Sequence, residues 1–168
     1  MKHLWICTTL VVCSAALILY LKKRHKKSKE EIRAKQELLD HVKQFSGCFQ
    51  PLFDAAESGN PLLAQKMLDS WKMRMTDCTV LESYFRKLSI KDKDPLDGAK
   101  EWIQVLEQWG VRHDMVGTVI CITKAHEMLY LFDDVYTLGS SARIVRPAWW
   151  LQTGDELICI ETGGAEIE

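Results

Sequence analysis

The first 27 residues constrain most strongly what this chain can fold into. Leu4 to Leu21 is an 18-residue run without a charged side chain, and residues 22–27 read Lys-Lys-Arg-His-Lys-Lys. About 20 apolar residues cross the hydrocarbon core of a bilayer as a helix. Lys and Arg flanking such a helix keep their side in the cytoplasm. The pattern predicts a single-pass transmembrane helix over residues 4–21 in the cell membrane, with the rest of the chain in the cytoplasm.

Other N-terminal signals compete with this anchor. A cleaved signal peptide has its charges before the apolar run, whereas here the basic block follows the run directly. A lipoprotein signal through Cys13 is disfavoured because the apolar stretch continues to Leu21. A buried core helix is disfavoured because residues 4–21 show no polar face. The order of the segments favours the anchor.

The charges divide the chain into a basic juxtamembrane block, residues 22–27, and an acidic body. The block is predicted to contact anionic lipid headgroups, at about 1 kcal/mol for each cation near the surface. Its cations are Lys22, Lys23, Arg24, Lys26 and Lys27. From residue 28 onward, 16 basic and 23 acidic residues give a formal charge of −7. An acidic body argues against nucleic acid as a partner.

Residues 28–110 have the signals of a short helical bundle. Asn60 and Asp94 are each followed by proline, which is typical of an N-cap before the first helical position. Gly110 suits the end of a helix. A short seam at coiled-coil spacing comprises Leu38, Val42, Phe45, Phe49 and Leu52. Such a seam fits either a homodimer or packing against the next helix.

Residues 111–168 change to a strand-like pattern. Runs rich in Val, Ile, Tyr, Trp and Thr predict strands over 116–123, 129–138, 143–152 and 156–162. Turns at 139–141 and 153–155 are predicted to join the last three as hairpins, and Pro147 predicts an edge strand or a bulge. The expected fold class is α+β, with a transmembrane helix, a helical region over 28–110 and a small β-domain over 111–168.

Trp149 and Trp150 are adjacent in one predicted strand. Neighbouring strand residues point to opposite faces, so only one of the two indoles can enter the same core. The other either packs against the helices or forms an exposed anchor for a partner.

The residues that carry chemistry form no catalytic constellation. The pairs His113-Asp114, His126-Glu127 and Asp133-Asp134 match no metal-site spacing. The six cysteines include no C-x-x-C pair. We therefore expect a binding protein without enzymatic activity, metal or cofactor, and the alternative is a hydrolase or metal enzyme that depends on His126.

One segment is similar to a known family. Residues 136–148, Tyr-Thr-Leu-Gly-Ser-Ser-Ala-Arg-Ile-Val-Arg-Pro-Ala, resemble the C-terminal signature of the GrpE family, the nucleotide exchange factors of 70-kilodalton heat-shock chaperones. Residues 106–111 look like the end of that family's last helix, and His126-Glu127 resembles its His-Glu pair. The resemblance covers residues 99–150.

The chain departs from the family at several points. Val135 stands where the family has glycine, the turn at 139–142 is longer, and the spacing from Glu127 to Tyr136 is shorter. A membrane anchor and a short helical block replace the long acidic tail and extended paired helix. The final residues continue past the usual end of the family.

The resemblance implies a co-chaperone that works by binding alone. A factor that prefers the open nucleotide cleft of the chaperone's ATPase domain shifts that domain toward the open form, and ADP leaves. The residues matching the family pattern are Tyr136, Arg143, Arg146 and Pro147, and we add Trp149 and Trp150 as candidate partner contacts. Arg143 is the leading contact because its guanidinium can pair with carboxylates in a forked geometry. The family also implies a homodimer, and the alternative function is a membrane-anchored scaffold that keeps the fold without exchange activity.

Overall fold

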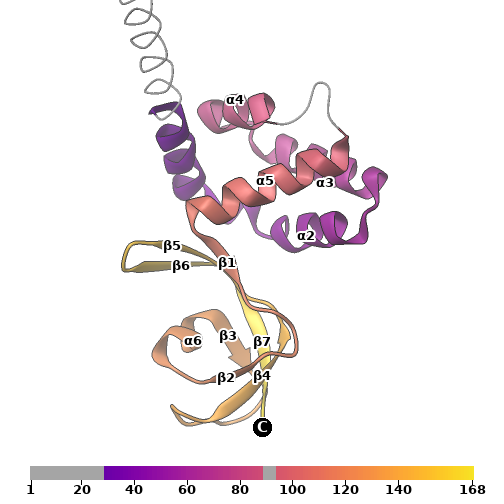
Figure 1. Ribbon diagram of the computed structural model, residues 1–168. Coiled ribbons are helices and arrows are strands. Elements are labelled where there is room, and N and C mark those ends of the chain that lie inside the picture. The colour runs from indigo at the N-terminus through magenta and orange to yellow at the C-terminus, as the bar shows by residue number, and fades with distance from the viewer. Residues whose placement is uncertain (1–28, 89–93) are drawn as a thin grey trace, which may run out of the picture.

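The computed structural model describes residues 29–88 and 94–168. Within these ranges the protein is α+β, as predicted, with helices first and two small sheets after them (Figure 1). The predicted anchor over residues 4–21 and the basic block at residues 22–27 lie outside the described residues. Of the helices in the described ranges, none combines the length and apolar character that a bilayer crossing requires.

The helical half begins with a helix over residues 29–40. A short 3-10 helix and four α-helices follow it: η1 (Val42–Phe45), α2 (Phe49–Ser58), α3 (Pro61–Arg74), α4 (Thr79–Leu88) and α5 (Pro95–Trp109). The predicted caps are confirmed: Asn60 Oδ1 accepts the N–H of Leu62 at 3.0 Å, and Asp94 Oδ1 accepts that of Leu96 at 2.9 Å. Gly110 ends α5 with a φ of 104°, a conformation that glycine adopts without a steric penalty.

The start of α4 is capped by a residue from a different helix. Glu37 Oε2 accepts the N–H of Val80 at 2.9 Å and that of Leu81 at 2.8 Å. These two donors would otherwise lack a partner in the first turn. A carboxylate is also favoured at the positive end of a helix dipole. Glu37 therefore ties the helix over residues 29–40 to α4.

The predicted coiled-coil seam is buried in the chain's own core. All five residues of the seam are at most 4% exposed: Leu38, Val42, Phe45, Phe49 and Leu52. Phe45 stacks on Trp71 of α3 at 4.9 Å between ring centroids, and Phe49 meets the same ring edge-on at 5.0 Å. Of the two alternatives, the structure has packing against a neighbouring helix. A homodimer stays a prediction, and it needs another surface.

The seven strands in the described residues form two sheets. They are β1 (Val111–His113), β2 (Val119–Cys121), β3 (Tyr130–Phe132), β4 (Ser141–Arg146), β5 (Trp149–Thr153), β6 (Glu156–Glu161) and β7 (Gly163–Ile167). The three-stranded sheet has the order β1-β5-β6 and is antiparallel. The four-stranded sheet has the order β2-β4-β7-β3, in which β3 runs parallel to β7 and the other pairs are antiparallel.

The three-stranded sheet lies between two hydrophobic cores. Trp149, Leu151 and Ile160 belong to the core of the helices. Trp150 and Leu157 instead pack against a second, smaller core under the four-stranded sheet. In Figure 1 the β5–β6 hairpin accordingly lies between the helices and the four-stranded sheet. Alternation along β5 thus sends the two adjacent tryptophans into different cores.

Two predicted strands are shorter than expected. The strand predicted over 116–123 narrows to β2, because a turn with Gly117 at φ 86° precedes it. The strand predicted over 143–152 is divided at Pro147 and Ala148 into β4 and β5, which belong to different sheets. Proline cannot donate to a ladder, and the register of β4 shifts between Ile144 and Arg146. The strand predicted over 156–162 corresponds to β6.

The strand predicted over 129–138 is wrong for most of its length. Residues 124–129 form a helix, α6 (Lys124–Leu129), and only residues 130–132 are a strand. The N–H of Thr123 donates to His126 Nδ1 at 3.2 Å and so stabilises the first turn of α6. The hairpin predicted across residues 139–141 is also wrong, because β3 pairs with β7 and β4 pairs with β2 and β7. The sequence pattern predicts neither β1 nor β7.

Candidate functional site

One face of the four-stranded sheet is turned away from the second core, and we call it the outer sheet face. Side chains such as Ile144 and Ala165 point into the core, so their neighbours along each strand point outward. The outer sheet face comprises Val119, Cys121, Leu131, Ser141, Arg143, Val145, Gly164 and Glu166, and the register shift in β4 adds Arg146, which pairs with Gly164. It brings together residues from all four strands of this sheet.

Three apolar side chains on the outer sheet face are open to solvent: Val119, Leu131 and Val145 are 47%, 65% and 44% exposed. Gly164 lies between Leu131 and Val145, since it pairs with Leu131 across the β3–β7 ladder and a Cβ at this glycine would lie 3.5 Å from Val145 Cγ2. An apolar surface without a covering element is typical of a site where another protein binds.

Apolar exposure is concentrated in this half of the molecule. Eight of the eleven exposed large apolar residues of the described chain fall between positions 115 and 145. Besides the three on the outer sheet face they are Met115, Val116, Met128, Val135 and Leu138. Scattered exposed apolar residues are ordinary, but most of those in the described chain fall in the half of the molecule that contains the outer sheet face.

Arg143 is the charged centre of the outer sheet face. Its Nη2 pairs with the carboxylate of Glu168, and its Nη1 donates to the carbonyl oxygen of Gly117 at 3.3 Å. The side chain is still 52% exposed, and a guanidinium has five N–H donors. Exposed ion pairs contribute about 0–1 kcal/mol. A carboxylate on a partner can therefore replace Glu168 at little cost.

Arg146 and Pro147 lie where the chain leaves this sheet. Arg146 is exposed, and its Nη2 donates to the carbonyl oxygen of Gly163 at 3.4 Å. Pro147 is half-buried between β4 and β5. Both residues shape the crossing from one sheet to the other.

Tyr136 lies in the loop between β3 and β4. Its hydroxyl donates to Glu127 Oε1 of α6 at 3.2 Å, and its ring lies 4.4 Å from that of Phe132. Partial desolvation, followed by the nearby Glu127 carboxylate, raises the pKa of this phenol. The loop is thereby held against α6 and β3.

The two predicted tryptophan contacts pack inside the molecule. Trp149 is buried, its ring stacks on His113 at 4.3 Å, and its Nε1 donates to Gln50 Oε1 at 3.2 Å. Trp150 is half-buried against the second core. Packing is therefore what the structure shows for Trp149, while part of Trp150 is accessible.

The structure does not gather the six predicted partner-binding residues into one cluster. Of these, Arg143 and Arg146 belong to the outer sheet face, and within the described chain no hydrogen bond or ring contact joins any two of the six. Sequence reasoning missed Val119, Leu131 and Gly164. The alternation of Arg143 and Val145 along β4 was the available signal, but the residues beside them come from β2, β3 and β7, whose pairing the sequence pattern does not predict.

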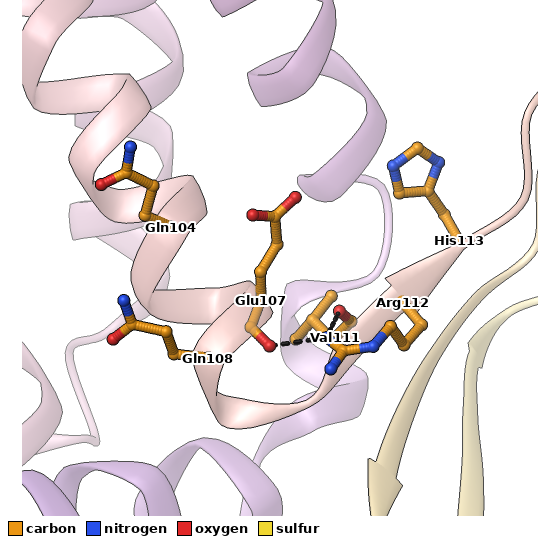
Figure 2. Close-up of a pocket in the computed structure, with 6 residues that line it drawn as sticks. All are labelled: Gln104, Glu107, Gln108, Val111, Arg112 and His113. Carbon is orange, nitrogen blue, oxygen red and sulfur yellow. Dashed lines mark hydrogen bonds between the residues drawn. The ribbon is translucent and has the colours of Figure 1, made fainter.

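A shallow pocket of about 490 Å³ lies where α5 meets β1 (Figure 2). Arg112 Nη1 donates to the carbonyl oxygens of Glu107, at 2.5 Å, and Val111, at 2.8 Å. Figure 2 shows Gln104 and Gln108 pointing away from Arg112, so the polar groups do not converge on a ligand position. Across residues 29–88 and 94–168, no three His, Cys, Asp or Glu side chains lie close enough together to hold a metal ion.

Comparisons with known proteins add no family to this description. No family model, curated protein or solved structure matches the chain. The resemblance to GrpE therefore rests on the residues quoted above, and its functional implications are proposals.

Proposed function

We propose that the protein is a membrane-tethered, GrpE-like nucleotide exchange factor that promotes ADP release from a cytoplasmic 70-kilodalton heat-shock chaperone. The observation that supports this best is the outer sheet face, which carries the exposed Val119, Leu131 and Val145 and an accessible Arg143. The segment resembling the GrpE signature, residues 136–148, contains β4, an inner strand of this face. The residues that suggest the family and the surface suited to a protein partner thus coincide.

The proposed mechanism requires differential binding and no reacting group. The outer sheet face binds a lobe of the ATPase domain in its open form, where burial of the apolar side chains supplies affinity. Arg143 pairs with a carboxylate of the chaperone and fixes the orientation. Because affinities are linked reciprocally, a factor that binds the open form better weakens ADP binding by the same ratio, usually about 5–150-fold.

In this proposal residues 4–21 hold the protein in the cell membrane, and the cations at 22–27 contact lipid headgroups. The described chain starts at residue 29, at one end of the molecule, and the four-stranded sheet lies at the opposite end (Figure 1). Such an arrangement keeps the outer sheet face at a distance from the bilayer, where a chaperone in the cytoplasm can reach it.

Binding to two nucleotide states tests the proposal. The full chain in lipid nanodiscs is titrated with the chaperone's ATPase domain, once nucleotide-free and once loaded with ADP. We expect tighter binding to the nucleotide-free form, and we expect Arg143→Ala and Leu131→Glu to weaken it. Ile32→Glu is the matched control, because Ile32 has the same exposure, 64% against 65%, but lies on the helix over residues 29–40.

A non-catalytic membrane scaffold is the second candidate, and the loop after β3 favours it. Val135 replaces a family glycine there and has a side chain 90% exposed, so the loop presents a different surface. A scaffold would bind both nucleotide states equally well. Equal affinities that are lost in Leu131→Glu would thus reject exchange activity and keep the outer sheet face as a docking site.

A further inference from the structure

The outward side of α3 is complementary to a second copy of itself in the reversed direction. Each apolar residue then meets an apolar residue, and each charge meets the opposite charge. Leu62, Lys66, Asp69 and Met73 are spaced four, three and four residues apart. At 3.6 residues per turn, this spacing places them in one narrow stripe along the helix. All four are exposed, Leu62 by 82% and Met73 by 70%. We call these four residues the α3 stripe.

The α3 stripe lies opposite the face that α3 buries. Ala64, Leu68 and Trp71 form the buried face, and α3 packs against α2 and α5, as Figure 1 shows. The side chains of Lys66 and Asp69 make no hydrogen bond or ion pair with any residue of the described chain. No element within residues 29–88 and 94–168 therefore covers the stripe, which has two charges of opposite sign between two apolar ends.

We propose that the α3 stripe is a two-fold contact between two copies of this chain. If two α3 helices lie antiparallel about an axis between positions 67 and 68, each residue faces its mirrored position. Lys66 then lies opposite Asp69 of the second copy, and Leu62 lies opposite Met73. The two-fold axis repeats both pairs, which is the property of an isologous interface.

The charges also select this arrangement against others. A parallel pair in register would place Lys66 opposite Lys66 and Asp69 opposite Asp69, and like charges in contact are unfavourable. Only the antiparallel pairing places each charge opposite its counter-charge and each apolar end opposite an apolar end. This surface differs from the seam at Leu38–Leu52, which the monomer buries.

The contact is expected to be weak. A helix of 14 residues is about 21 Å long, and one such stripe buries much less than the roughly 1,200–2,000 Å² of a stable interface. Tethering in a membrane raises the effective concentration and favours such weak pairs. The inference is independent of the proposed exchange activity, so either can fail without the other.

Charge exchange tests the pairing directly. Sedimentation equilibrium of the full chain, in density-matched detergent, measures association as concentration rises. In a dimer of the Lys66→Glu variant, both Lys–Asp pairs become Glu–Asp pairs. In a dimer of the Asp69→Lys variant, both become Lys–Lys pairs. We expect each to weaken association by about tenfold. An equimolar mixture of the two variants, and the double variant, restore both attractive pairs and should associate like the wild type.

Lys100→Glu is the control, because it changes the same charge at an exposed position of α5 outside the stripe. It should associate like the wild type. The proposal is overturned if the wild type stays monomeric at every concentration. It is equally overturned if the single variants associate like the wild type, or if their mixture associates no better than either alone.

Discussion

Gly163 shows how a single residue fixes the junction between the sheets. A Cβ at this position would lie 2.5 Å from Tyr130 Cε1, 2.6 Å from the carbonyl oxygen of Arg146 and 2.7 Å from the nitrogen of Ala148. Two of these three neighbours are backbone atoms, which cannot turn aside as a side chain can. β7 can therefore approach the crossing between β4 and β5 only with glycine here.

Gly163→Ala should destabilise the fold by about 1–3 kcal/mol, the usual cost of overpacking. Gly164→Ala is the matched control, because its Cβ would meet nothing closer than Val145 Cγ2 at 3.5 Å. The free energy of unfolding of the full chain, measured in detergent by chemical denaturation, checks both. Equal losses in the two variants would contradict this reading of the junction.

The raised pKa of Tyr84 leads us to predict that the folded protein loses stability at alkaline pH. Burial, followed by the carboxylates of Glu31, Glu30 and Glu101, raises the pKa of Tyr84 to about 12. An unfolded tyrosine titrates near pH 10, so the folded chain binds more protons between pH 10 and about 12. Stability from this group is present below pH 10 and falls as the pH rises through that window.

Tyr84→Phe should remove that part of the alkaline loss. Denaturation of both proteins at pH 9 and at about pH 11 measures it, because the difference between the two proteins isolates Tyr84 from the other titrating groups. A wild type and a variant that lose the same stability would show that Tyr84 ionises as easily in the folded chain as in the unfolded one.

Among the elements, β5 joins the two cores. Trp149 packs with Phe53 and His113 on the helical side, at 4.7 and 4.3 Å between ring centroids. Trp150 packs on the other side against the second core. β5 therefore helps to fix the position of the four-stranded sheet relative to the helices.

Trp149→Ala should cost about 3–5 kcal/mol, as large deletions in a core do. Trp150→Ala should cost less, because its side chain is only half-buried. Thermal unfolding of both variants, followed by near-ultraviolet circular dichroism, ranks them. A larger loss of thermal stability in Trp150→Ala than in Trp149→Ala would contradict this prediction. It would mean that β5 is stabilised mainly by the second core and not by the core of the helices.

Elements determined by local contacts could be predicted from the sequence, and those determined by distant pairing could not. The caps at Asn60 and Asp94 depend on neighbouring residues, so both helix starts are correct. The partners of β7 lie far away in the chain, and its Gly163-Gly164 start has little intrinsic preference for a strand. Arg143 was predicted as a contact, whereas Leu131 and Gly164 join it only through the pairing of β3, β7 and β4.

At the scale of the whole molecule, the helices and the sheets are fixed to each other. Lys43 Nζ donates to the carbonyl oxygen of Cys159 at 2.6 Å, and the N–H of Gly47 donates to Glu161 Oε1 at 2.5 Å. These contacts add to the burial of Trp149 and tie η1 and the turn after it to β6. The outer sheet face therefore has a set position relative to residue 29, which suits a module that positions a partner at a distance from its tether.

The central claim is tested most directly by the rate at which a fluorescent ADP analogue leaves the chaperone. The full chain in nanodiscs is added at rising concentration, and the release rate is followed by stopped-flow fluorescence. The account predicts an acceleration that saturates with concentration, disappears in Arg143→Ala and persists in Ile32→Glu. A release rate that stays constant with a folded chain and its own chaperone would contradict it.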